Sequence, residues 1–269
     1  PGVFGDNLSF ISDTTIAAVR TQKTKMSDKF KTNFLIVLPA AVATVILLMV
    51  FSAGGHPGAQ AGTYSWVKVL PYLGVLIFAL LGFNVMAVIF GGIVLAGVIG
   101  ISDGSLTLHT YLTAITEGIG GMSELIILSL LIGGMAEMMK RNGGIAFLLQ
   151  FVSRRIRSKK GAEAGIAGLV SAANLATANN TIAIITAGPL AKDLSDRYGI
   201  DNRKSASILD IFSCAVQGLI PYGAQMLSAA QIAKISPISI LPYSFYPILI
   251  GVCGICAIIF RLPRFTEKA

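Results

Sequence analysis

Charged side chains are scarce in this sequence. Asp, Glu, Lys and Arg together make up 13% of the 269 residues, whereas a soluble domain usually carries about 25%. Hydrophobic residues make up 54% of the chain, and the mean hydropathy is +0.75. This balance excludes an ordinary soluble domain and predicts an all-α polytopic membrane protein.

Cysteine and histidine are also rare, with three and two copies. All three cysteines lie in apolar segments, and the CxxC pair formed by Cys253 and Cys256 has no further Cys or His beside it. We interpret the cysteines as residues that fill the packed interior, not as a metal or redox site. No cofactor is expected.

Basic residues outnumber acidic ones and give a net charge of +8, but they do not form one basic face. They cluster at the ends of apolar segments, as the cytoplasmic loops of membrane proteins do. The pattern predicts contact with a lipid bilayer and no binding to nucleic acid. Basic residues before Phe34 and after Phe260 place both of these positions, and the C-terminus, on the cytoplasmic side.

Five apolar segments approach the roughly 20 residues that cross a bilayer as a helix. They are 34–52, 67–81, 85–101, 122–139 and 242–260. Segment 102–121 lacks Lys and Arg and is expected to be an outside loop. Segment 144–157 is short and has basic residues on both sides, which predicts an interfacial helix.

The polar run NLATANNT, Asn174 to Thr181, separates two apolar arms. Its amides and hydroxyls need partners, because an unpaired polar group in lipid costs several kcal/mol. Basic residues flank both arms, so both ends are expected in the cytoplasm. We therefore predict a re-entrant helical hairpin over 162–192 with its tip at Thr177 to Thr181. A crossing helix is the weaker alternative, because it would place the basic segment 192–204 outside.

A second interruption, GLIPYG at Gly218 to Gly223, predicts a broken helix over 204–233. A shift of 208 residues sets Asp13 on Pro221 and Phe34 on Pro242, and both copies contain a polar broken segment, a linker and an apolar span. Their charge flanks are opposite, which is typical of inverted-topology repeats. We expect residues 1–66 to end a first repeat, residues 67–269 to form a second, and the chain to be the C-terminal part of a longer protein.

The first copy opens with a dense group of oxygen-bearing side chains. They are Asp6, Asn7, Ser9, Ser12, Asp13, Thr14 and Thr15. Carboxylate, hydroxyl and amide oxygens suit Na⁺, and a carboxylate in a low-dielectric pocket can exchange a proton for a cation. The alternative is a helix cap, since SDTT is good capping sequence. The repeat favours a transport site, with Na⁺ expected at Asp13, Ser12 and Asn180.

The second repeat supplies further candidates at the hairpin tip and beside the second interruption. The candidate substrate-binding residues are Thr177, Asn179, Asn180, Thr181, Tyr222 and Gln225. A structural turn satisfied by helix ends is the alternative for the tip, and interhelical bonding is the alternative for Tyr222 and Gln225. Glu137 and Asp210 lie inside apolar spans, where each is either a proton or cation carrier or a member of a structural pair.

The stretch FGDNLSFISDTT, followed by a basic linker and a span, resembles the signature of NhaC-type Na⁺/H⁺ antiporters in the ion transporter superfamily. MMKRNGG, NLATANNT, GPLAKDLSDRYGI and LIPYGAQ follow in the order that this family shows. The resemblance assigns Asp6, Ser9, Ser12, Asp13 and Thr14 to the transport site of the first repeat, and Thr177, Asn179, Asn180 and Thr181 to the hairpin tip of the second. Family members often carry an acid where Asn179 stands. The resemblance also implies a homodimer and an elevator movement of the hairpin domain.

The expected function is secondary active transport, not enzyme catalysis. In this interpretation an inner-membrane antiporter exports Na⁺ against inward H⁺, and Asp13, helped by Asp6, binds the two ions competitively. The alternative is a Na⁺-coupled transporter or exchanger of a small organic anion or amino acid, in which Asn179, Asn180 and Thr181 hold the solute carboxylate. A channel or structural subunit is a third class, which the inverted repeat disfavours.

Overall fold

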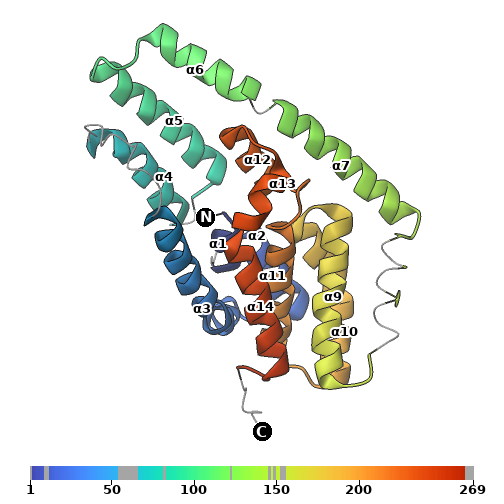
Figure 1. The fold of residues 1–269 in the computed structure, drawn as a ribbon. Helices are drawn as coiled ribbons and strands as arrows, with labels where there is room; N and C mark the ends of the chain where they lie inside the picture. Colours follow the sequence, from blue (N-terminus) through green and yellow to red (C-terminus); the bar gives the residue numbers. More distant parts are fainter. Residues whose placement is uncertain are drawn as a thin grey trace. The chain divides into compact units, whose positions relative to one another are not determined.

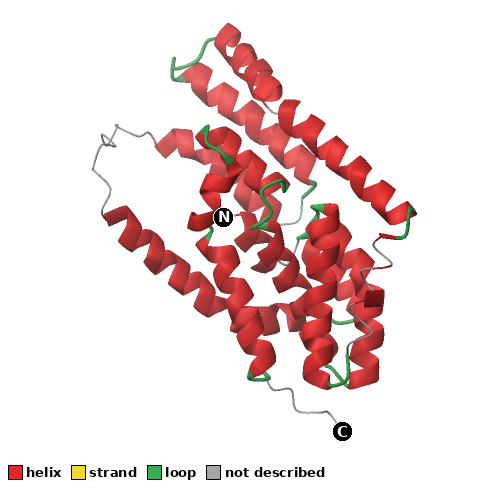
Figure 2. Ribbon diagram, turned by 45° about the vertical axis from the view of Figure 1, so that its right-hand side comes forward, coloured by secondary structure: helices red, strands yellow, loops and turns green. Residues whose placement is uncertain are grey.

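The computed structural model describes residues 2–8, 12–53, 66–80, 83–121, 123–144, 147, 150–151 and 156–263. These residues form helices and loops and no strand, which confirms the all-α prediction (Figure 2). The chain divides into two compact units, residues 1–54 with 127–269 and residues 55–126.

Helix α11 (Asn202–Gln217) is the central helix of the first unit, and it is buried on most of its sides. It packs against helices from both ends of the unit's sequence. These are α2 (Asp13–Gln22), α3 (Met26–Ala53), α9 (Lys159–Thr177), α10 (Asn180–Tyr198) and α14 (Phe245–Ile259). Small buried side chains such as Ser205, Ala206 and Ser207 allow this close approach of helix backbones.

Helices α9 and α10 lie side by side as a hairpin (Figure 1). Ala178 takes the left-handed conformation, with φ 49°, and ends α9. Asn179 is extended, and its side-chain oxygen accepts a hydrogen bond from the Ile182 N–H at 2.9 Å, which caps α10. The polar run of the sequence therefore lies at the junction of two packed helices.

Two further breaks separate successive helices, and they fall at matching positions of the two proposed repeats. Helix α1 (Gly2–Leu8) ends before α2 begins at Asp13, and α11 ends before α12 (Ala224–Ala233) begins. A shift of 208 residues carries Leu8 to Val216 and Asp13 to Pro221, so the two interruptions overlap.

Helix α3 begins at Met26, before the predicted apolar segment 34–52. The expected basic linker is therefore partly helical, and Lys29, predicted as a flanking cytoplasmic charge, is buried. The reason is spacing: Lys29 and Asn33 continue the helical stripe of buried Ile36, Val37 and Ala40, so they face the packed side of the same helix.

Only one helix among the described residues is long and apolar enough by itself to cross a membrane, namely Met26–Phe51, with mean hydropathy 2.9. The segments Pro237–Tyr243 and Phe245–Ile259 pass the same test together, with a bend of 55° between them. The predicted final span, 242–260, thus begins at the end of the first segment and includes the bend.

The second unit contains the 3₁₀ helix η1 (Trp66–Val69) and the helices α4 (Leu70–Leu80), α5 (Val85–Ser102) and α6 (Leu108–Gly121). Helix α5 covers the predicted apolar segment 85–101. The predicted loop over 102–121 is wrong from Leu108 onward. Thr107 and Thr110 exchange hydrogen bonds between their hydroxyls and backbone N–H groups at 2.8 and 3.2 Å, which starts α6.

Helix α7 (Ser123–Arg141) follows, where the span 122–139 is predicted. The predicted interfacial helix over 144–157 lies largely outside the described residues.

Helix α2 packs closely against α10 at Gly188. A Cβ atom at this position would lie 2.6 Å from Thr21 Cβ and Cγ2, closer than any normal contact. Gln22 Nε2 also donates to the Gly188 carbonyl at 2.9 Å, and Ser205 Oγ to Gln22 Oε1 at 2.8 Å. Glycine at 188 therefore allows α2, α10 and α11 to be tied together by hydrogen bonds.

We predict that Gly188→Ala destabilises the first unit by about 1–3 kcal/mol, because the added methyl group forces α2 away from α10. The thermal unfolding midpoint in detergent measures this. Gly91→Ala is the matched control: it sits in α5 with open space around the added Cβ, and we expect no loss of stability. Equal midpoints for wild type and Gly188→Ala would contradict the close-packing argument.

Candidate functional site

Two carboxylates of the N-terminal broken helix contact the tip of the hairpin. Asp6 Oδ2 accepts a hydrogen bond from Asn180 Nδ2 at 3.3 Å, and Asp13 Oδ2 accepts one from Thr181 Oγ1 at 2.6 Å. The paired residues are 174 and 168 positions apart in the chain. The fold thus brings the two polar stretches that the sequence marks as candidate sites into direct contact.

Hydroxyl groups at the start of α2 bond to the end of α1. Thr14 Oγ1 donates to the Asp6 carbonyl at 3.0 Å and lies 2.7 Å from Ser12 Oγ. Thr15 Oγ1 reaches the same Asp6 carbonyl at 3.5 Å. These bonds satisfy a carbonyl at the end of α1 that has no partner within the helix. Asp13 opens α2, where the partial positive charge of a helix N-terminus stabilises a carboxylate.

The second broken helix completes the cluster from the other side. Gln225 Nε2 lies 3.5 Å from Asp6 Oδ2, and Gln217 Nε2 donates to Gln225 Oε1 at 2.8 Å and to the Ala178 carbonyl at 3.0 Å. Tyr222 donates its hydroxyl to the Leu175 carbonyl at 2.8 Å. The hairpin is therefore bonded to the end of α11 through Gln217 and to the interruption between α11 and α12 through Tyr222.

The first turn of α10 satisfies its own backbone donors. Asn179 Oδ1 accepts from the Ile182 N–H, and Asn180 Oδ1 accepts from the Thr181 N–H at 3.0 Å. The Thr177 hydroxyl lies 2.9 Å from the Ala173 carbonyl and 3.1 Å from the Asn179 carbonyl. Thr177 and Asn179 therefore shape the tip, whereas Asn180 and Thr181 present their side chains to the carboxylates.

A buried polar network lies beside this cluster. Lys29 Nζ and Asp210 Oδ2 are 2.6 Å apart, and both side chains are excluded from solvent. Asn33 Nδ2 donates to Asp210 Oδ2 at 3.1 Å and to Asn7 Oδ1 at 3.0 Å, and Asn7 Nδ2 lies 3.3 Å from Asp210 Oδ2. Of the predicted site residues, Asn7 and Asp210 thus belong to this buried network with Lys29 and Asn33.

Two predicted site residues are not among those described above. Ser9 lies outside the described residues. Glu137 lies on α7, where its carboxylate accepts a hydrogen bond from Arg141 Nε at 2.9 Å, one turn along the same helix.

Sequence reasoning missed the part that Lys29 and Asn33 play, because both stand in a run of basic and polar residues that looks like the flank of a span. The spacing of Lys29 and Asn33 in the sequence could have indicated that they are buried. They are four residues apart and in helical register with Ile36, Val37 and Ala40, all of which are buried.

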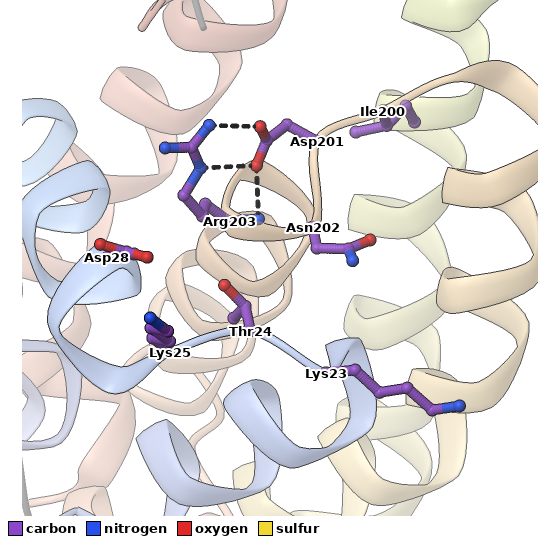
Figure 3. Close-up of a pocket in the computed structure, with 8 residues that line it drawn as sticks. All are labelled: Lys23, Thr24, Lys25, Asp28, Ile200, Asp201, Asn202 and Arg203. Atoms are coloured by element: carbon purple, nitrogen blue, oxygen red, sulfur yellow. Dashed lines mark hydrogen bonds and ion pairs between the residues drawn. The ribbon is translucent and has the colours of Figure 1, made fainter. Parts of the chain in front are cut away.

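A polar hollow of about 480 Å³ lies where α2 and α3 meet the start of α11 (Figure 3). Its lining residues are Lys23, Thr24, Lys25, Asp28, Ile200, Asp201, Asn202 and Arg203. Asp201 accepts hydrogen bonds from the Arg203 backbone N–H and Nε, both at 2.8 Å, and from Nη2 at 2.6 Å. The Arg203 guanidinium lowers the pKa of Asp201. The Asp201 carboxylate thus serves as the N-cap of α11.

Comparison with known proteins shows which family the sequence resembles. A family model described as the Na⁺/H⁺ antiporter family matches residues 59–262. The Na⁺/H⁺ antiporter NhaC of Bacillus subtilis strain 168 is 24% identical over 90% of this chain and 61% of its own length. The NhaC of Alkalihalophilus pseudofirmus is 24% identical over 94% of this chain and 63% of its own.

A third relative is named for a different exchange reaction. The malate-2H⁺/Na⁺-lactate antiporter of B. subtilis strain 168 is 21% identical over 89% of this chain and 58% of its own length. The chain therefore spans less than two thirds of the length of each of these relatives. No solved structure matches it.

We predict that Asp201→Ala lowers the stability of the first unit by about 1 kcal/mol, because α11 loses its N-cap. Asp201→Asn keeps a capping oxygen and loses only the charge of a partly exposed ion pair, so it is expected to lose less stability than Asp201→Ala. The pKa of Asp201 is lowered in the folded state, so the charge stabilises the fold above the ordinary carboxyl pKa. That contribution disappears as the pH falls through the lowered value.

Thermal unfolding midpoints in detergent, at neutral and at acidic pH, measure both effects. Asp193→Asn, an exposed carboxylate on α10, is the control and is expected to behave as wild type. If the alanine and asparagine variants lose equal stability at neutral pH, the capping bond is not the source of the effect.

Proposed function

Because the chain belongs to the Na⁺/H⁺ antiporter family, we propose that the protein exchanges Na⁺ for H⁺ by secondary active transport across the plasma membrane. The family agrees with the resemblance seen in the sequence. The observation that carries the proposal is the contact of two carboxylates, Asp6 and Asp13, with Asn180 and Thr181 of the hairpin tip. Such a cluster of oxygen atoms on three interrupted elements is suited to a desolvated Na⁺.

The chemistry of the cluster accounts for competition between the two ions. Asp6 and Asp13 accept hydrogen bonds from neutral amide and hydroxyl donors, and no ion pair of the described residues involves either of them. A carboxylate without a fixed cationic partner can hold a proton or Na⁺, but not both at once.

The same neighbours can serve the ion-bound form. An amide carries an oxygen as well as its NH₂ group, and a hydroxyl keeps lone pairs when it donates. In our proposal Asn180 and Thr181 turn their oxygens toward Na⁺ once it enters. Asp13, Ser12 and Asn180 form the core of the cation site, with Asp6, Thr14 and Gln225 around it. Asn179 and Tyr222 hold the hairpin that carries Asn180 and Thr181.

The arrangement of interrupted helices also suits alternating access. The interruptions of α1–α2 and α11–α12 overlap at a shift of 208 residues, which supports two inverted repeats with the site at their interface. We propose that the hairpin α9–α10 re-enters from the cytoplasmic side and moves with α2 and α11 as an elevator. We further propose that the protein is a multi-pass homodimer with a cytoplasmic C-terminus.

A Na⁺-coupled exchanger of small organic anions is the second candidate, favoured by the similarity to the malate-2H⁺/Na⁺-lactate antiporter. Two observations weigh against an anion at this tip. The first N–H groups of α10 are occupied by Asn179 and Asn180 side chains, and the tip faces the Asp6 and Asp13 carboxylates, which repel an anion.

We predict that the full-length protein in proteoliposomes with a trapped pH dye moves protons when a Na⁺ gradient is imposed without any organic solute. Asp13→Asn is expected to reduce this signal to that of empty liposomes, because the substituted amide cannot exchange a proton for Na⁺. Asp193→Asn should retain the wild-type rate. Silence of the wild type until malate, lactate or an amino acid is added would replace this proposal with the second candidate.

We predict that Thr181→Val raises the apparent KM for Na⁺ about tenfold, because it removes the hydroxyl that lies 2.6 Å from Asp13 Oδ2. Thr181→Ser keeps the hydroxyl and should stay near the wild-type KM. The same proteoliposome assay, with the Na⁺ concentration varied, separates the two variants. If valine and serine give equal KM values, Thr181 is not part of the site.

A further inference from the structure

Lys29 and Asp210, beside the candidate cation site, form the most deeply buried ion pair among the residues that the structure describes. The two side chains come from α3 and α11, Nζ and Oδ2 are 2.6 Å apart, and their exposed fractions are 1% and 0%. A buried ion pair is stable only if its remaining hydrogen-bonding groups also find partners.

That condition is met on both sides of the pair. The Lys29 ammonium has three protons and three acceptors around it: Asp210 Oδ2, Thr15 Oγ1 at 2.9 Å and the Asn7 carbonyl at 3.3 Å. Asp210 Oδ2 also accepts from Asn33 and Asn7 amides. Asp210 thus has a fixed cationic partner, in contrast to Asp6 and Asp13.

The bonds of Lys29 also reach both halves of the first broken helix. Asn7 directly follows Asp6 at the end of α1, and Thr15 lies two residues after Asp13 in the first turn of α2. The Thr15 hydroxyl that accepts from Lys29 lies 3.5 Å from the Asp6 carbonyl. One ammonium group therefore fixes the backbone segments that carry the two candidate ion-binding carboxylates.

We propose that Lys29 is a positioning residue of the cation site. It neutralises Asp210, so that Asp6 and Asp13 alone face the transported cation, and it holds Asn7 and Thr15 so that these two carboxylates keep their spacing. This assigns Asp210 to a structural pair and not to the ions that move. The inference rests on the proposed function only in that the site binds Na⁺, and it does not require H⁺ as the exchanged ion.

The test is Na⁺ binding to the purified full-length protein, measured by isothermal titration calorimetry. Asp210→Asn leaves the ammonium uncompensated beside the site, and we expect its repulsion to raise the Kd for Na⁺ at least about tenfold. The double variant Lys29→Gln with Asp210→Asn removes both charges together. We expect it to bind Na⁺ within about threefold of the wild-type Kd, because the glutamine amide can still donate to Thr15 or Asn7.

A second pair of variants tests the positioning role without touching any charge, and it decides the matter if the charge variants do not fold. Thr15→Val removes the acceptor of Lys29 and is expected to raise the Kd for Na⁺ about three- to tenfold. Thr15→Ser keeps the hydroxyl and should match wild type. A wild-type Kd in Asp210→Asn, loss of binding in a folded double variant, or equal Kd values for the two Thr15 variants would each overturn the inference.

The same preparation separates this inference from the proposed exchange. A wild-type protein that binds Na⁺ but moves no protons in liposomes would refute Na⁺/H⁺ antiport and leave the role of Lys29 to be judged by the Kd values. A wild-type protein that binds no Na⁺ would overturn both.

Discussion

A hydrogen-bonding group removed from water costs about 1–3 kcal/mol when it has no partner, and this constraint determines how the interrupted helices of the first unit meet. Each interruption leaves backbone groups without helical partners. The Asp6 carbonyl takes threonine hydroxyls, the Asn7 carbonyl takes Lys29 and Asn33, and the Ala178 carbonyl takes Gln217. Every one of these bonds comes from another element or from across an interruption, so the helix ends fix one another in place.

Helix α11 makes this arrangement possible because it is polar on sides that face other helices. Asp210 meets Lys29 and Asn33 of α3, the Ser213 carbonyl accepts from Asn174 of α9 at 2.6 Å, and Ser205 meets Gln22 of α2. Its small neighbours allow close approach, and the polar groups then set which residues lie opposite each other. A helix of this kind gives a unique register where apolar packing alone would allow sliding.

The polar interruptions could be predicted from sequence, because Asn, Thr, Pro and Gly between apolar arms cannot all be satisfied inside one continuous helix. The contact between Asp13 and Thr181 could not, since nothing in either stretch encodes which distant element it will meet. Asn7 was grouped with Asp6 by sequence, yet adjacent residues at the end of a helix point to different sides, so Asn7 turns to Asp210. The burial of Lys29 was not predicted for another reason. Several lysines stand close together in this segment, and only the helical register indicates which of them is buried.

The contrast between the paired and the unpaired carboxylates has a further consequence for how such a carrier would avoid slippage. The Lys29–Asp210 pair has no net charge, so moving it through a low-dielectric barrier carries little electrostatic cost. Asp6 and Asp13 are held by neutral donors, so an empty, ionised site has two negative charges that oppose any such movement. Only a site loaded with cations would reorient freely. Obligatory exchange would then follow from the charge of the empty site, without a separate gate to enforce it.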